Sequence, residues 1–243
     1  MSRFYVPKEN VDGSRIRIEG HEARHVLNVM RLSVSDRVVV FDGTGNEYVG
    51  FIRETRPGRV VVEIVETKIP APEDMPRVTL AQAVPKKGRM DYIVQKATEL
   101  GVYRIIPVFA ERCVAQTDPD RGAVKAKRWQ RIAEEAAKQC GRKCVPEISR
   151  VTEFREAVND IENYDLALAA WLSDDTVSLK AAISGFSGRS VVVFIGPEGD
   201  FTPGEMNMAM THPNCKAVSL GRRVLKSDTA GLFALSCLNY ELT

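Results

Sequence analysis

Two loops in the C-terminal half of the chain have residue types that suit the binding of a small polar ligand. The first, Gly-Pro-Glu-Gly at 196–199, directly follows the apolar run 191–195. Glycines on both sides of a rigid Pro-Glu pair let the backbone approach a ligand closely. A well-formed turn between a strand and a helix would use similar residues, but loops at such places often carry function. We therefore predict that this loop contacts a ligand.

The second loop, residues 221–226, carries three cations and leads into the last predicted helix. Ser227 is suited to cap that helix, and Asp228 is favourable next to its N-terminal dipole. Cations beside a helix start can hold a phosphate or a carboxylate. The alternative is that the apolar residues of this loop only pack against the sheet.

Signatures of several other enzyme classes are missing. The sequence contains no phosphate-binding P-loop, dinucleotide fingerprint or serine-hydrolase elbow. His21 and His25 are four residues apart but lack the glutamate and the third ligand of a zinc site. The five cysteines are odd in number and form no C-x-x-C pair, so we expect buried or half-buried free thiols and no metal.

The elements that must position these loops alternate between strands and helices after residue 77. We expect strands at 78–84, 104–109, 165–170, 191–195 and 217–220, and helices at 90–100, 125–140 and 228–240. Thr202, Pro203 and Glu205 predict a capped helix start after the first loop. Such alternation indicates a mostly parallel sheet with helices on both faces. Ligands bind beyond the carboxyl ends of such strands, which is where both loops lie.

The first seventy residues have a different pattern. Alternating or β-branched runs separated by turn residues predict strands at 15–18, 37–41, 47–52 and 59–65. Apolar residues between His21 and Met30 have the spacing of one helix face. We predict a small barrel or curled sheet with one helix. Three prolines within 68–76 indicate a linker, so the expected domains are 1–70 and 77–243.

Charge is unevenly distributed along the chain. The net charge is only +2, but residues 77–150 carry 16 basic and 8 acidic side chains. This segment indicates a face that binds a polyanion, with a solvated helix face as the alternative. No apolar run is long enough to span a bilayer and the start does not resemble a signal peptide, so we expect a cytoplasmic protein.

Several motifs resemble, in order along almost the whole chain, those of one known family. They are Arg3-Phe4-Tyr5, His21-x-x-x-His25-Val26-Leu27, Arg31, Lys86 to Gly101, Arg112, Arg128 to Arg142, Gly196-Pro197-Glu198-Gly199 and Leu220-Gly221-x-Arg223-Val224-Leu225. The family is RsmE, whose members methylate N3 of a uridine in 16S ribosomal RNA. The resemblance implies an α/β SPOUT (trefoil-knot) methyltransferase domain behind a small N-terminal PUA-like β-barrel domain. It also implies S-adenosyl-L-methionine as cofactor and a homodimer formed through the knotted domain.

The resemblance further implies site residues. The cofactor is expected at Leu168, Ala169, Ala170, Gly196, Pro197, Glu198, Gly199, Leu220, Gly221, Val224, Leu225, Ser227 and Thr229, with Trp171 ending the first of these loops. RNA, expected as 16S rRNA within the assembled small subunit, is expected at Arg3, Arg24, His25, Arg31, Lys86, Lys87, Arg89, Lys96, Arg112, Lys138 and Arg142. Our hypothesis for catalysis is that Arg223 stabilises the uridine anion, with Arg3 of a partner subunit as a weaker candidate. No general base can be identified.

Two positions depart from the family pattern. Asp200 stands where the family usually has a second glycine, and aspartate tolerates a left-handed backbone better than most residues. Lys226 stands for an arginine and loses its two-pronged geometry. Three other readings remain open: the same enzyme acting on another RNA, a non-catalytic RNA-binding protein, and a phosphometabolite enzyme. The last leaves the basic segment unexplained.

Overall fold

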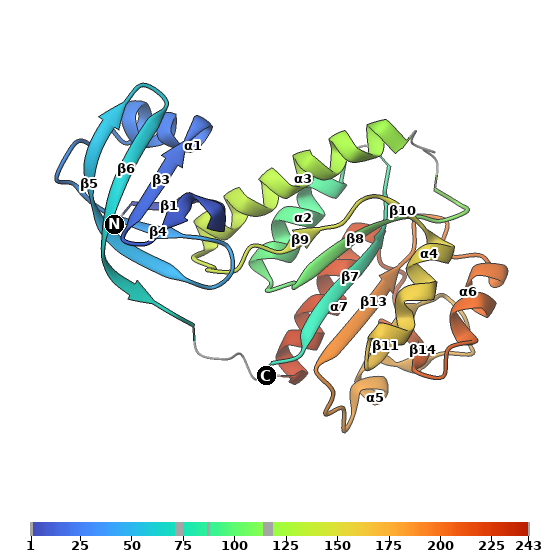
Figure 1. Cartoon of the computed structure of the whole chain (residues 1–243). Helices are drawn as coiled ribbons and strands as arrows, with labels where there is room; N and C mark the ends of the chain where they lie inside the picture. Colours follow the sequence, from blue (N-terminus) through green and yellow to red (C-terminus); the bar gives the residue numbers. More distant parts are fainter. Residues whose placement is uncertain (1, 71–74, 87, 114–118, 243) are drawn as a thin grey trace. The chain divides into compact units, whose positions relative to one another are not determined.

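The computed structural model describes residues 2–70, 75–86, 88–113 and 119–242 and is drawn in Figure 1. The chain forms two compact units. The first consists of residues up to 73 together with 137–145, and the second consists of 74–136 and 146–243. No pattern in the sequence indicates that residues 137–145 belong with the N-terminal residues.

A six-stranded sheet with the strand order β1-β4-β5-β6-β3-β2 forms the first unit. All neighbouring strands are antiparallel except β1 and β4. Its core contains Phe4, Ile16, Ile18 and Ile52, all fully buried. The predicted strands are therefore confirmed, and two short strands are added. The elements are β1 (Arg3–Tyr5), η1 (Lys8–Asn10), β2 (Val11–Asp12), β3 (Arg15–Glu19), β4 (Arg37–Phe41), β5 (Glu47–Arg56) and β6 (Arg59–Lys68).

The helix predicted between His21 and Met30 is present, with Ala23 and Val26 buried as its spacing requires, but the spacing fails at Met30. An α-helical turn, α1 (Gly20–Arg24), continues as a π-helical turn, η2 (His25–Val29). The wider turn shifts each later side chain around the axis, so the spacing of an ordinary helix no longer predicts the buried face. Accordingly Val26 is fully buried, whereas Met30 is 41% exposed.

The second unit is built on a sheet with the strand order β10-β8-β7-β13-β11-β14-β12, with β9 beside β8. All these pairs are parallel, as predicted. The strands are β7 (Arg77–Ala83), β8 (Arg104–Phe109), β9 (Glu147–Ile148), β10 (Thr152–Glu153), β11 (Leu166–Ala170), β12 (Val177–Ser178), β13 (Ser190–Ile195) and β14 (Cys215–Ser219).

Helices cover both faces of this sheet, as Figure 1 shows for α7 and α4. Ala81 and Ala83 of β7 share a core with Phe154 of α4, while Leu80 and Gln82 face Gly231 of α7. The helices are α2 (Met90–Glu99), α3 (Pro119–Cys140), α4 (Phe154–Asn159), α5 (Leu179–Ile183), α6 (Pro203–Met210) and α7 (Ser227–Leu242), with η3 (Asp160–Asn163) after α4.

Two predicted helix ends are confirmed. The capping box at α6 is present, with Thr202 and Glu205 each accepting a hydrogen bond from the other's backbone N–H and Pro203 in the first turn. Gly101 has the left-handed backbone, φ +86°, of a residue that ends a helix, here α2. α3 begins at Pro119 rather than near Lys125, so this prediction was short by more than one turn.

The cysteines are free thiols in the structure. Cys215 is buried, and burial raises the pKa of its thiol to about 12. Burial also raises the pKa of Cys113. Cys140 is exposed, which contradicts the expectation that every thiol is at least half-buried. Among the described residues, no helix combines the length and apolar character that crossing a membrane requires.

Candidate functional site

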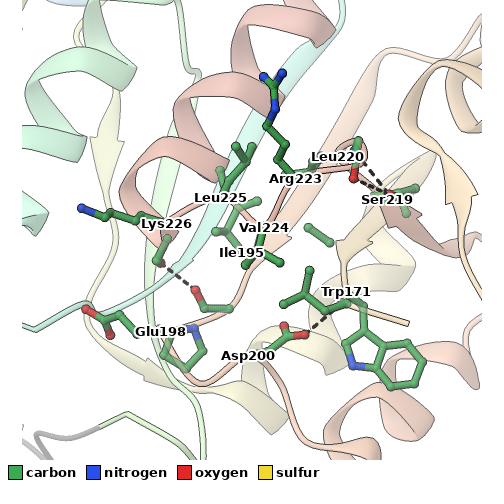
Figure 2. Close-up of a pocket in the computed structure, with 18 residues that line it drawn as sticks. Trp171, Ile195, Glu198, Asp200, Ser219, Leu220, Arg223, Val224, Leu225 and Lys226 are labelled. Atoms are coloured by element: carbon green, nitrogen blue, oxygen red, sulfur yellow. Dashed lines mark hydrogen bonds between the residues drawn. The ribbon is translucent and has the colours of Figure 1, made fainter. Parts of the chain in front are cut away.

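A cavity of about 250 Å³ lies in the second unit at the carboxyl ends of β11, β13 and β14 (Figure 2). Three chain segments that follow these strands form its wall, and Ala230 of α7 completes it. The lining residues are Ala170, Trp171, Leu172, Ile195, Gly196, Pro197, Glu198, Asp200, Val218, Ser219, Leu220, Gly221, Arg223, Val224, Leu225, Lys226, Ser227 and Ala230. The two loops singled out from the sequence thus lie on one cavity.

The predicted cofactor residues divide into two groups by position. Those that line the cavity are Ala170, Gly196, Pro197, Glu198, Leu220, Gly221, Val224, Leu225 and Ser227. Leu168 and Ala169 do not line it, because both are fully buried within β11. Gly199 and Thr229 also lie outside the lining, although their neighbours Glu198 and Asp200, and Ser227 and Ala230, belong to it.

Sequence reasoning did not place Leu172, Ile195, Val218, Ser219 and Ala230 on the site. Ile195 and Val218 lie at or next to the carboxyl ends of their strands, so the strand-end rule could have found them. Leu172 carries no comparable signal, because its place depends on how the chain turns after β11. Its side chain is 63% exposed, so a large apolar group stands at the cavity rim.

The cavity has an apolar wall and a polar side. Ile195 and Val218 are almost completely buried beneath it. Figure 2 shows Glu198 and Asp200 on the side formed by the loop after β13, with Lys226 on the opposing segment. A cavity of this kind suits an organic molecule with a flat apolar part and several charged groups.

Long-range hydrogen bonds fix the loop after β13. The Glu198 carboxylate accepts a bond from the backbone N–H of Lys86 (3.1 Å). The Arg112 guanidinium donates to the carbonyl of Gly199 (2.6 Å). A side chain at Gly196 would crowd this loop, because its Cβ would lie 3.0 Å from Asp200 Oδ1.

Asp200 adopts the left-handed backbone that the sequence led us to expect, with φ +59°. The Asp200 carboxylate also forms two hydrogen bonds. One carboxylate oxygen accepts a hydrogen bond from Phe201 N–H (2.9 Å), and the other accepts one from Leu172 N–H (2.9 Å). Asp200 therefore ties the loop after β13 to the segment that follows β11, which glycine could not do.

The prediction that Ser227 caps α7 is wrong. Ser227 is the first residue of α7, and the first helical hydrogen bond joins Ala230 N–H to the carbonyl of Lys226. The Ser227 hydroxyl instead donates to the carbonyl of Gly196 (2.6 Å), a bond drawn in Figure 2. It also accepts from the amide of Gln82 (2.9 Å). The serine thus joins both cavity loops rather than closing its own helix.

Arg223 lies on the cavity wall, but its guanidinium extends away from Glu198 and Asp200 (Figure 2). Its side chain is exposed, and it forms no ion pair with any residue that the structure describes. A cation with this freedom can turn toward an anionic group at the cavity mouth.

The RNA-binding residues predicted in the second unit differ in whether their charged groups already have partners within the protein. Arg89 forms an ion pair with Asp228 (3.2 Å), and Lys96 forms one with Glu99 (2.8 Å). Lys86 is exposed, and the Arg112 guanidinium donates its hydrogen bond to the Gly199 carbonyl. Lys87 lies outside the described residues.

In the first unit, Arg3 lies against Arg142 although the two are 139 residues apart in the sequence. Arg3 donates to the carbonyl of Arg142 (2.9 Å), pairs with Glu47 (3.4 Å) and stacks on Phe41. Lys138 forms a mostly buried ion pair with Glu22 (3.0 Å). Arg24 and Arg31 are exposed and His25 is half-buried beside Phe4. Much of this predicted basic surface therefore holds the unit together.

Comparison with known families matches both parts of the chain. Residues 72–239 match the model of an RNA methyltransferase domain. Residues 18–65 match the model of an RNA methyltransferase PUA domain. The predicted fold class, a SPOUT-type α/β domain with an N-terminal PUA-like domain, is confirmed by these matches and by the solved structures below.

Curated and solved relatives cover nearly the whole chain. The ribosomal RNA small subunit methyltransferase E of Bacillus subtilis is 30% identical over 99% of this chain and 97% of that protein. A methyltransferase E from Neisseria gonorrhoeae, solved with S-adenosyl methionine, has a TM-score of 0.85 and 30% identity over 99% of this chain and 98% of that one. A putative methyltransferase from Legionella pneumophila, solved with the same cofactor, has a TM-score of 0.86 and 30% identity over 98% and 97%. The chain belongs to the ribosomal RNA small subunit methyltransferase E family of RNA methyltransferases.

Proposed function

We propose that this protein transfers the methyl group of S-adenosyl-L-methionine to N3 of a uridine in the 16S RNA of the small ribosomal subunit. The observation that carries the proposal is the cavity at the carboxyl ends of β11, β13 and β14, in a chain that belongs to a family of RNA methyltransferases. The same cofactor is bound in two solved relatives at 30% identity. The cytoplasm, where small subunits work, is the place of action.

The residues of the cavity fit this cofactor. The apolar wall at Ile195, Val218 and Leu225 suits an adenine ring. The carboxylates of Glu198 and Asp200 suit a ligand that carries an ammonium and a sulfonium, and Lys226 suits its carboxylate. When bound, the cofactor supplies an already activated methyl group.

The protein must then position and activate the uridine. Holding N3 in line with the methyl group turns methyl transfer from a bimolecular reaction into an effectively unimolecular step. N3 becomes a good nucleophile only after its proton leaves, and water can accept that proton. A fixed cation favours the anionic base. Arg223 lines the cavity, and its exposed guanidinium, which pairs with no acidic residue that the structure describes, is the cation that the bound uridine would fix in place.

RNA recognition is divided between the two predicted domains, 1–70 and 77–243. The family match of residues 18–65 to a PUA domain supports the first. Lys86 is an exposed cation on the segment whose backbone N–H contacts the Glu198 carboxylate, and this supports the second. Contacts of cations with phosphates place the RNA without reading its sequence, so binding weakens as salt is added.

The protein acts as a homodimer formed through its second unit. Packed against one another, α2 and α7 leave Tyr92 51% exposed and Phe233 42% exposed, and Tyr240 at the end of α7 is 84% exposed. Large apolar groups gathered on two neighbouring helices are typical of a protein interface. Sedimentation of the protein and of Phe233→Asp tests this: we expect a dimer and a monomer, respectively.

The function is tested by methyl transfer from labelled S-adenosyl-L-methionine to small ribosomal subunits that lack their native uridine methylation, with the product mapped by mass spectrometry. We expect label at one N3-methyluridine with assembled subunits as substrate. Arg223→Ala is expected to lower kcat about 100-fold while the cofactor still binds. Cofactor binding without label on these subunits would direct the search to another RNA. No cofactor binding at all would leave an RNA-binding protein without enzymatic activity.

A further inference from the structure

A fully buried amide side chain lies near the carboxyl end of β7. Gln82 of β7 has no exposed surface, and its neighbours Ala81 and Ala83 are fully buried. A buried amide is unfavourable unless its hydrogen bonds are made, and packing alone would be served better by an apolar residue. Its oxygen, Oε1, has no hydrogen-bond partner among the described residues. Retention of the amide therefore needs another explanation.

The amide nitrogen begins a chain of hydrogen bonds that reaches the cavity. It donates to the carbonyl of Ala83 (3.1 Å) and to the hydroxyl of Ser227 (2.9 Å). That hydroxyl donates to the carbonyl of Gly196 (2.6 Å). Because a carbonyl can only accept, the hydroxyl proton must point to Gly196, which leaves the serine oxygen free to accept from Gln82. The bonds thus run in one direction, from β7 through α7 to the loop after β13.

A glycine on α7 allows this approach. A Cβ atom at Gly231 would lie 2.6 Å from Oε1 of Gln82 and 3.7 Å from the Leu80 side chain. Any larger residue at this position would therefore displace the Gln82 amide or the helix. Gln82 contacts the beginning of α7 at two places, Ser227 and Gly231, one turn apart.

We infer that Gln82 is a positioning residue, which acts through Ser227 to hold the two cavity loops at the separation the cofactor requires. The inference rests on the proposed function, since it takes S-adenosyl-L-methionine as the ligand. Gln82 does not line the cavity, so its effect reaches the ligand only through Ser227 and Gly196. Losing the amide donor loosens the loops without removing any group that touches the ligand.

Gln82→Met tests this directly, because methionine has a similar shape but cannot donate. Leu80→Met is the matched control: Leu80 is on the same strand and face, is fully buried, and packs near the same glycine. We expect Gln82→Met to weaken the binding of S-adenosyl-L-methionine about tenfold by calorimetry, the loss of one hydrogen bond at a buried site. Without cofactor, it should also speed amide hydrogen exchange in residues 196–201 and 226–231. Leu80→Met should do neither.

Ser227→Ala removes the same link from its other end by deleting one oxygen atom. Because Ser227 itself lines the cavity, the deciding measurement for this variant, should Gln82→Met fail to fold, is hydrogen exchange without cofactor, which should rise in residues 196–201. The double variant should bind the cofactor no more weakly than the weaker-binding single variant, because both changes break one chain of bonds. Equal binding and exchange in Gln82→Met and Leu80→Met would overturn the inference, as would losses that multiply in the double variant. If the wild-type protein bound no cofactor, the proposed function would fail, while the exchange rates would still decide whether Gln82 holds the loops.

Discussion

The turn after β4 and the loop after β13 both contain an aspartate, but the two side chains work at different ranges. Asp42 accepts hydrogen bonds from the Thr44 hydroxyl (2.7 Å), Asn46 (2.8 Å) and Tyr48 (3.0 Å). All of its partners lie within six residues. Asp200, by contrast, reaches the backbone of Leu172, 28 residues away.

Two further long-range hydrogen bonds hold the loop that contains Asp200. Glu198 accepts from Lys86, which is 112 residues away, and Gly199 accepts from Arg112, 87 residues away. The Asp42 side chain thus bonds within its own turn, whereas the side chains at the cavity loop bond to distant segments of the second unit. The backbone of the Asp42 turn does reach distant residues, since Gly45 N–H donates to the Lys143 carbonyl (3.2 Å) and Val145 N–H donates to the Gly43 carbonyl (3.0 Å). Local bonds stabilise a turn wherever it is placed, but long-range bonds make the shape of a cavity depend on the whole unit.

The largest effect is expected from Asp42→Ala. The change removes the acceptor of Thr44, Asn46 and Tyr48, and leaves a nearly buried tyrosine hydroxyl without its partner. We expect a loss of about 3 kcal/mol in the free energy of unfolding of the first unit. Hydrogen exchange should rise in residues 37–56, while the cofactor affinity of the second unit should not change. A weakened cofactor affinity would break the contrast between the two loops.

The pH dependence of the stability of the first unit also tests whether the Asp42 carboxylate stabilises its turn. Burial raises the pKa of Asp42, but hydrogen bonds from Asn46, Thr44 and Tyr48 outweigh it, so the pKa lies below the ordinary 3.8. A lowered pKa means that this carboxylate stabilises the fold above its unfolded-state pKa and loses that effect as the pH falls through the folded-state pKa.

Asp42→Asn removes the titrating group and serves as the reference. Urea unfolding followed by circular dichroism at pH 6 and pH 3 should show wild-type stability falling toward that of the variant at the lower pH. The expected gap is about 1 kcal/mol at pH 6. A gap that stays constant or widens toward pH 3 would mean that the carboxylate charge is not what the turn uses.

Substitutions of Asp200 should have smaller effects, and on the ligand rather than on the fold. Alanine loses the bond to Leu172 and also disfavours the left-handed backbone, φ +59°. Glycine loses only the bond, and asparagine keeps an acceptor oxygen. We therefore expect the dissociation constant of S-adenosyl-L-methionine to rise about tenfold for Asp200→Ala, less for Asp200→Gly and least for Asp200→Asn. Equal affinities by calorimetry would show that the bond to Leu172 does not shape the cavity.

The smallest effect is expected from Arg112→Met, which keeps an apolar stem but removes the donor to Gly199. Because neither Arg112 nor Gly199 lines the cavity, whereas Asp200 and Leu172 both do, the change should weaken cofactor binding only about twofold. RNA binding should also fall slightly, and the loss should shrink as salt is added, since a cation has been removed. An effect as large as that of Asp200→Ala would show that the bond to Gly199 shapes the cavity as strongly as the bond to Leu172 does.

Features that depend on near neighbours could be predicted. The capping box at Thr202, the helix end at Gly101 and the left-handed turn at Asp200 all follow from residue types within a few positions. The alternation of strands and helices also indicated the parallel sheet, and the strand-end rule brought the two cavity loops to the same edge. Even so, the π-helical turn after Arg24 escaped notice, because apolar spacing assumes an ordinary helix.

The sequence by itself determined the class of fold, the position of the candidate cavity and the family. Only the tertiary structure placed residues 137–145 in the first unit, directed Ser227 to Gly196 rather than to its own helix, and gave Gln82 a role. The physical reason is the range of the interactions. Periodicity and capping are fixed by bonds within a few residues of the chain, whereas Gln82 and Ser227 are 145 residues apart, and only packing of the whole unit brings them within hydrogen-bond distance.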